Sequence, residues 1–194
     1  MKKLACLLLA LALCACAACA SADAFELRNG IRFGMTAGEI IEKEGRAPDY
    51  DTTPEFISYR GVEAEGYPDS IVEYHFDENG KLNYVYMSLH EGQKASVLEK
   101  DYKAVTKAFT GLYGKPLGNK NGKTDELAGS ALKSAFARQS MAKASKATFT
   151  LKYNEWKVEA DEGIVKVEQI YTAQKSKIAN TQDHVVCYTL FPAQ

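Results

Sequence analysis

The stretch FGMTAGEII, residues 33–41, carries the strongest local signal in the chain. Thr36 is followed three residues later by Glu39, the spacing of a capping box in which each side chain accepts a hydrogen bond from the other residue's backbone N–H. Met35 before the cap and Ile40 in the first turn are spaced as a hydrophobic staple. The sequence therefore predicts a helix that begins at Thr36.

This helix is expected to end near Glu44, because Gly45 suits the left-handed position after a helix and Pro48 cannot continue one. Apolar residues then alternate with polar ones, which is the periodicity of strands. An Asn-Gly pair at 79–80 is typical of a hairpin turn. Three antiparallel strands are predicted, at 56–59, 71–76 and 82–89.

The same order of elements recurs in the second half. Ser96 and Glu99 have the spacing of a second capping box, and Gly114 with Pro116 is expected to end the helix. One apolar stripe follows the helix at spacings of three and four, formed by Leu98, Tyr102, Val105, Phe109 and Leu112. Three more strands are predicted, at 148–158, 164–171 and 184–191.

The predicted fold class is therefore α+β, built from two tandem units that each hold one helix and a three-stranded antiparallel sheet. The units span residues 23–92 and 93–194. The second unit contains an insertion at about 117–146. Residues 125–144 of this insertion favour a helix, and their Ser, Ala and Lys content is also typical of a mobile arm.

Composition and charge restrict the class of protein. The 194 residues include 24 Lys and Arg against 25 Asp and Glu, giving a net charge of -1, and 46% are hydrophobic. These values are typical of a globular domain. A nucleic-acid partner is not expected, because phosphate binding needs concentrated positive charge that this sequence lacks.

Residues 1–22 are predicted to be a signal peptide. Two lysines after Met1 precede an apolar run of about ten residues and then small residues, which is the order of an export signal. The apolar stretch is shorter and weaker than the roughly 20 residues that a transmembrane helix needs. We therefore expect an extracytoplasmic protein of the cell envelope.

Two ways of processing this leader fit the sequence. LCAC, residues 13–16, resembles a bacterial lipobox, in which the cysteine, here Cys16, becomes the lipidated first residue and a membrane anchor. The triplet 20–22 fits ordinary cleavage after Ala22, which releases a soluble chain. We favour lipidation at Cys16. Four of the five cysteines lie in the leader, and Cys187 is expected to be a buried free thiol rather than a nucleophile.

The first half resembles a small-lipoprotein family. Phe33-Gly34-Met35-Thr36, the exit GRAP at 45–48, and the hairpin with Tyr74-His75-Phe76 and Gly80-Lys81-Leu82 are similar to the SmpA/OmlA (BamE-like) domain. The two-unit layout resembles that of the β-lactamase inhibitor protein. These resemblances imply a non-enzymatic envelope protein that binds another protein, in the second case through a sheet face.

The sequence offers no strong pattern for chemistry. The three histidines are not spaced with each other, or with Cys or carboxylates, as metal ligands would be. No Gly-x-Ser-x-Gly elbow or phosphate loop is present, and the acidic turn at 77–80 lacks the ligand spacing of a calcium loop. We expect no catalytic residues, no metal and no cofactor.

Aromatic residues in the predicted strands are the candidates for binding a protein partner. Tyrosine and tryptophan bring a large contact area with few rotatable bonds and a polar tip. The predicted partner-binding residues are Tyr59, Tyr74, Tyr84, Tyr86 and Trp156. Packing of these rings inside the protein is the other interpretation. The alternative function is a small-ligand protein or enzyme with a pocket between the two units.

Overall fold

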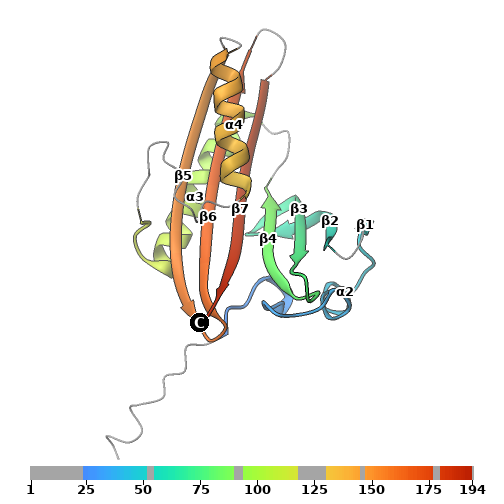
Figure 1. Cartoon of the computed structure of the whole chain (residues 1–194). Coiled ribbons are helices and arrows are strands. Elements are labelled where there is room, and N and C mark those ends of the chain that lie inside the picture. Colours follow the sequence, from blue (N-terminus) through green and yellow to red (C-terminus); the bar gives the residue numbers. More distant parts are fainter. Residues whose placement is uncertain are drawn as a thin grey trace, which may run out of the picture.

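The computed structural model describes residues 24–51, 55–89, 94–117, 130–144, 147–176 and 180–193 (Figure 1). Within these residues the helical elements are a 3-10 turn, η1 (Arg28–Gly30), and the α-helices α2 (Ala37–Glu44), α3 (Ala95–Tyr113) and α4 (Ser130–Ala144). The strands are β1 (Tyr50–Asp51), β2 (Phe56–Ala64), β3 (Tyr67–Phe76), β4 (Leu82–Ser88), β5 (Thr148–Ala160), β6 (Gly163–Lys175) and β7 (Asn180–Pro192).

All of these strands belong to one antiparallel sheet, in the order β1-β2-β3-β4-β7-β6-β5. The last strand, β7, pairs with β4, and Tyr86 lies opposite Cys187. The prediction of two tandem units, each with its own three-stranded sheet, was therefore wrong. Strand β4 bears apolar residues on both faces, which suits a strand inside a sheet, and its pairing with β7 removes the exposed edge that a separate sheet would have left.

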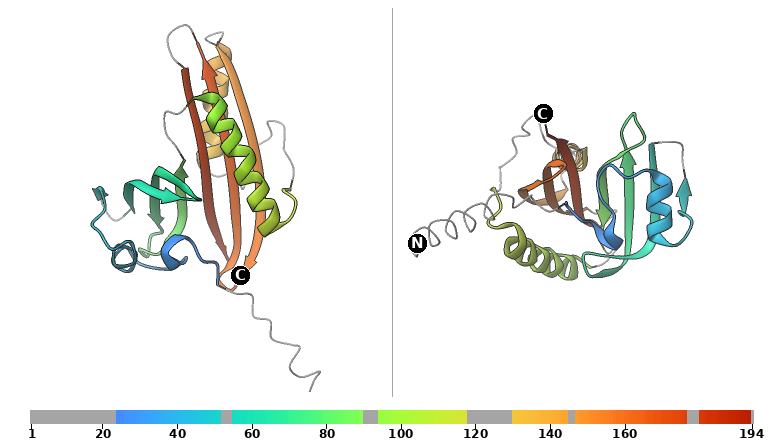
Figure 2. Two further views of the ribbon diagram at one scale, coloured as in Figure 1. Left: turned by 180° about the vertical axis from the view of Figure 1, so that it is seen from behind. Right: turned by 90° about the horizontal axis from the view of Figure 1, so that it is seen from below.

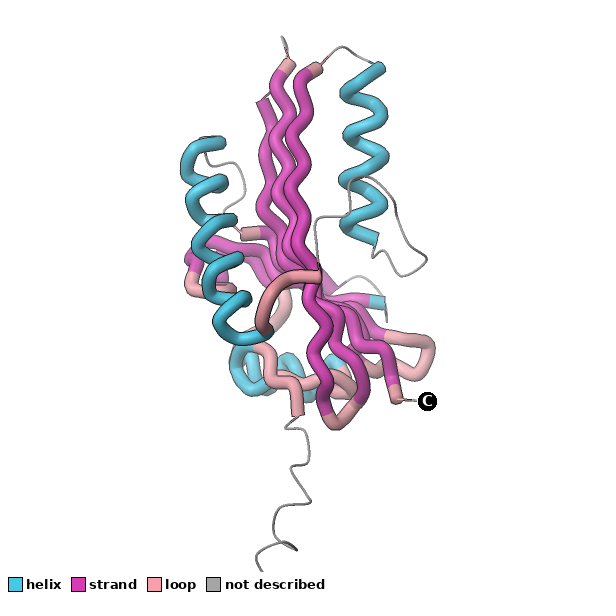
Figure 3. The backbone as a smooth tube through the Cα atoms, turned by 90° about the vertical axis from the view of Figure 1, so that its left-hand side faces the viewer, coloured by secondary structure: helices cyan, strands magenta, loops and turns pink. Residues whose placement is uncertain are grey.

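The two long helices pack on opposite faces of the sheet. Helix α3 contacts β5, β6 and β7, whereas α4 contacts β5 and β6 (Figure 3). Seen from behind, α3 crosses the long strands while β2, β3 and β4 extend to one side of them (Figure 2). The sheet is thus covered by α3 on one face and only partly by α4 on the other.

The main hydrophobic core lies on the α3 face and runs through both halves of the chain. Phe109 of α3 packs edge-on against Trp156 of β5, with ring centroids 5.5 Å apart, and it also meets Tyr188 of β7. The same cluster includes Tyr59 and Val72 from the first half. Because one core joins both halves, neither half buries its apolar residues by itself.

The predicted start and end of α2 are confirmed. The Thr36 N–H donates to Glu39 Oε2 at 2.7 Å, and the Glu39 N–H donates back to Thr36 Oγ1 at 3.4 Å. Gly45 has a φ of 68°, the left-handed conformation that glycine adopts without a steric penalty. The helix buries Ile40 against the core.

The second capping box was a wrong prediction, although the helix itself is present. Helix α3 begins at Ala95 after Lys94, whose side chain makes no capping hydrogen bond. The apolar stripe is buried from Leu98 to Phe109, but Leu112 is 71% exposed. The stripe therefore leaves the sheet in the last turn.

Within the predicted insertion, Ser130–Ala144 is a helix, as the first of the two interpretations expected. It buries Ala135 and packs Phe136 on the second apolar cluster, which lies on the α4 face. The leader 1–22 with Cys16, and residues 118–129, lie outside the described residues. No helix in the described part of the chain is long and apolar enough to cross a lipid bilayer.

Candidate binding groove

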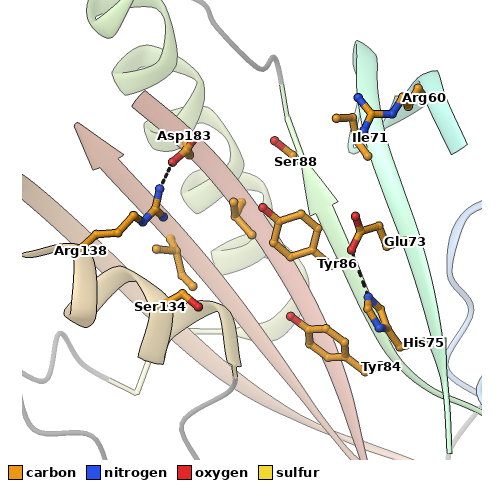
Figure 4. A pocket seen from close by; sticks show the side chains of 12 residues that line it. Arg60, Ile71, Glu73, His75, Tyr84, Tyr86, Ser88, Ser134, Arg138 and Asp183 are labelled. Carbon is orange, nitrogen blue, oxygen red and sulfur yellow. Dashed lines mark hydrogen bonds and ion pairs between the residues drawn. The ribbon is translucent and has the colours of Figure 1, made fainter. Parts of the chain in front are cut away.

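An open groove of about 450 Å³ lies between α4 and the part of the sheet formed by β2, β3 and β4 (Figure 4). Strand pairing places its lining residues in rows across the sheet. One row runs Arg60, Ile71, Ser88 and Val185. The lining residues are Arg60, Ile71, Glu73, His75, Tyr84, Tyr86, Ser88, Ser134, Arg138, Ile170, Asp183 and Val185.

The floor of the groove is aromatic. Tyr84 and Tyr86 alternate with Val85 along β4, so their rings lie on the α4 face while Val85 enters the main core. The Tyr84 hydroxyl donates a hydrogen bond to Cys187 Sγ at 3.2 Å. Burial raises the pKa of Tyr86, so its phenol is neutral at physiological pH. The floor therefore offers two uncharged rings.

One wall carries an acid and an imidazole from β3. His75 Nε2 lies 3.2 Å from Glu73 Oε2, and both side chains are 31% exposed. The His75 ring stacks on Phe56 of β2, with centroids 5.1 Å apart, and its other neighbour is Tyr84 at 5.2 Å. The two aromatic neighbours fix the plane of the imidazole, and Glu73 holds one of its nitrogens.

The opposite wall is formed by α4 and the start of β7. Arg138 Nη1 forms an ion pair with Asp183 Oδ2, which also accepts a hydrogen bond from Thr172 Oγ1 at 3.2 Å. Ser134 lies one turn before Arg138 on the same side of the helix and also lines the groove. The ion pair joins α4 to β7 at the edge of the groove.

Two of the five aromatic residues predicted to bind a partner, Tyr84 and Tyr86, line this groove (Figure 4). Tyr59 and Tyr74 are fully buried, and Trp156 is 1% exposed. These three rings point into the main core on the other face of the sheet. They do not belong to an exposed surface in this structure, so the interpretation that they pack inside the protein applies to them.

The buried rings have polar contacts that explain their position. The Tyr74 hydroxyl donates to Glu44 Oε1 at 2.5 Å, and Glu44 also forms an ion pair with Arg28. The Trp156 indole N–H donates to the Gly114 carbonyl at 3.0 Å, at the end of α3. These two hydrogen bonds therefore join the sheet to α2 and to the end of α3, respectively.

Several groove residues were missed from the sequence, namely Arg60, Glu73, His75, Ser88, Ser134, Arg138 and Asp183. One signal was available in the sequence. Side chains alternate between the two faces of a strand, so positions 71, 73 and 75 share one face of β3, and positions 84, 86 and 88 share one face of β4. The register that sets these two rows side by side, and the approach of Arg138 from α4, are tertiary features.

A buried polar cluster lies beside the floor, on the same face of β5 and β6. Lys166 Nζ is 3.3 Å from Glu168 Oε1, and the Tyr153 hydroxyl lies 2.6 Å from Glu155 Oε2 and 3.1 Å from Glu168. Within the described residues, no three His, Cys, Asp or Glu side chains are grouped as a metal site requires.

No protein-family model, curated protein or solved structure matches the chain. The resemblance of the first half to the SmpA/OmlA domain, and the envelope role that it implies, therefore stay predictions.

Proposed function

We propose that this chain is an exported, non-enzymatic interaction module of the cell envelope, which binds a segment of a partner protein in the groove between α4 and β2–β4. The observation that carries this proposal is the groove itself, with Tyr84 and Tyr86 as its floor. Tyrosine rings in a concave site provide contact area with little loss of side-chain entropy.

The contacts within the groove favour binding over catalysis. His75 is held by Glu73, but neither Ser88 nor Ser134 has a hydrogen bond to a histidine among the described residues. An activated serine would need such a base within hydrogen-bond reach. Cys187 is fully buried, and burial raises its thiol pKa, which opposes thiolate chemistry.

The location at the cell envelope in this proposal rests on the predicted leader. Lipidation at Cys16 would hold the module at a membrane surface, and cleavage after Ala22 would release it. Between the leader and Phe25, the first core residue, lie only two residues or, after lipidation, eight. A lipid anchor would therefore keep the domain close to the membrane.

A small organic ligand is the second candidate for the same groove. Its volume of about 450 Å³ lies within the range of roughly 300–1,000 Å³ that such ligands occupy. A ligand of that size would be enclosed on more sides than an extended segment, and the groove is open. We therefore place the protein segment first.

The test fills the groove without touching the core. Ser134 and Ala137 are both exposed on α4, but only Ser134 lines the groove. In the cells that make the protein, cross-linking captures the partner of the native chain. We expect Ser134→Trp to abolish this capture, because the indole occupies the groove. Ala137→Trp, the matched control, should capture as much partner as the native chain. Equal capture by both variants would exclude the groove as the binding site.

A further inference from the structure

The polar groups of the groove are unevenly satisfied. Its two acids are already in use, since Glu73 is held by His75 and Asp183 accepts hydrogen bonds from Arg138 and Thr172. A ligand cation would share these carboxylates with donors that the chain already supplies. The acids are therefore less available to a positively charged ligand than unpaired carboxylates would be.

Two donor groups, by contrast, lack acceptors within the described residues. Arg138 Nε is buried and has no hydrogen-bond partner among the described residues. The Arg60 guanidinium likewise forms no hydrogen bond or ion pair within the described part of the chain. It attracts Asp49, but that carboxylate is already bound by the Arg60 backbone N–H at 2.6 Å and by Arg46 Nη2 at 2.9 Å.

Arg60 and Arg138 belong to different walls of the same end of the groove. Arg60 lies in the row that contains Ser88 and Val185, and Arg138 pairs with Asp183, two residues before Val185 on β7 (Figure 4). The Glu73 and His75 pair lies further along β3, beside Tyr86 and Tyr84. One end of the groove thus has donors without acceptors, and the rest of the groove is lined by aromatic rings.

Resting on the proposed function, we infer that the partner segment is acidic and extended, with a carboxylate on Arg60 and an apolar or aromatic side chain on the rings of Tyr86 and Tyr84. A guanidinium binds a carboxylate through two parallel N–H groups, which fixes both position and orientation.

The rows set the spacing of the recognised residues. Along the strand direction, the row of Arg60, which contains Ser88, is two residues from Tyr86. Across the sheet, Arg60 on β2 is two strands, or roughly 10 Å, from β4, a width that the long side chains of Arg60 and of the acid have to bridge. An extended segment lying along the strands advances about 3.3 Å per residue and turns alternate side chains to the same face. The acid and the apolar residue are therefore expected at positions i and i+2 of the segment.

Two peptides test this inference with the full-length chain: acetyl-Asp-Gly-Phe-amide and acetyl-Asn-Gly-Phe-amide, measured by calorimetric titration. We expect the Asp peptide to bind about fivefold more tightly, the upper range for an exposed ion pair. Arg60→Gln should reduce its affinity to that of the Asn peptide. Lys81→Gln, an exposed position in the turn before β4, should leave the ratio unchanged.

The outcomes separate this inference from the proposed function. Equal affinity for the two peptides, or binding of neither, overturns the acidic-segment inference. If Ser134→Trp still abolishes partner capture in that case, groove binding stands without it. An affinity ratio that survives Arg60→Gln would also overturn the assignment of the carboxylate to Arg60.

Discussion

The Tyr84 hydroxyl and the Cys187 sulfur form a hydrogen bond of 3.2 Å across the junction between β4 and β7. This contact lies under the floor of the groove and joins the first half of the chain to its last strand. The thiol is fully buried, and the loss of solvation raises its pKa far above its ordinary value, although the Tyr84 hydroxyl partly opposes that shift. The contact is therefore a structural one that is closed to solvent.

Cys187 is expected to resist alkylation in the folded protein. Each unit of raised pKa lowers the reactive thiolate fraction about tenfold, and burial also blocks the reagent. Iodoacetamide labelling, followed by mass spectrometry, should be more than about tenfold slower in the native chain than in urea. The same rate in both conditions would show that the sulfur is accessible.

Phe109 is expected to be a main source of stability, because it joins α3 to Trp156 and Tyr188. Phe109→Ala should lower the free energy of unfolding by about 3–5 kcal/mol through loss of burial and creation of a cavity. Urea denaturation measures this change. Leu112→Ala, on the same helix but exposed, should change it by no more than about 0.5 kcal/mol. Similar losses for both variants would contradict the packing described for α3.

The hydroxyl of Tyr74 is expected to stabilise the protein through Glu44. Removing it by Tyr74→Phe leaves the buried Glu44 carboxylate with fewer donors, so the free energy of unfolding should fall by about 1.5–3 kcal/mol. Tyr113→Phe is the control, because that hydroxyl has no hydrogen bond within the described residues; burial, with the charge of Glu65 adding to it, raises the pKa of Tyr113 to about 12. If Tyr74→Phe left the free energy of unfolding unchanged, water would have replaced the lost hydrogen bond to Glu44.

Asp49 is expected to make stability depend on pH. The Arg60 backbone N–H lowers the pKa of the Asp49 carboxyl, and the charge of Arg46 adds to the effect. Because the folded pKa lies below the unfolded one, this stabilisation is complete above the unfolded pKa and is lost as the pH falls through the folded pKa.

Asp49→Asn should therefore lower the urea midpoint at about pH 7, and the two chains should converge as the pH approaches about 3. Asp161→Asn, in the exposed turn between β5 and β6, is the comparison for removing a surface carboxylate. A midpoint difference for Asp49→Asn that is the same at both pH values would contradict the account.

Local structure could be predicted well from the sequence, because its causes lie within a few residues. Thr36, Glu39 and Gly45 determine the ends of α2 through contacts within one helical turn. The alternation along β3 and β4 likewise located both strands. The pairing of β4 with β7 was not predictable in this way, since it depends on residues far apart in the chain.

The candidate site shows the same limit. Tyr74 and Tyr84 look equivalent in the sequence, but Tyr74 lies next to Val85 in the pairing of β3 with β4 and enters the core, whereas Tyr84 lies next to His75 on the other face. Which face is covered depends on where α3 and α4 pack. Arg138 joins the groove only because α4 packs on β5 and β6 and so brings Arg138 within reach of Asp183 on β7, and no local pattern contains that information.

Site-specific photo-crosslinking shows directly whether the groove is the binding site. A benzophenone amino acid is placed at Ser134, in the groove, or at Ala137, on the outer side of α4, and the adducts formed in the native cells are identified by mass spectrometry. We expect one protein adduct from position 134, mapped to an acidic segment, and none from position 137. Adducts from position 137 alone, or the same adducts from both positions, would contradict it.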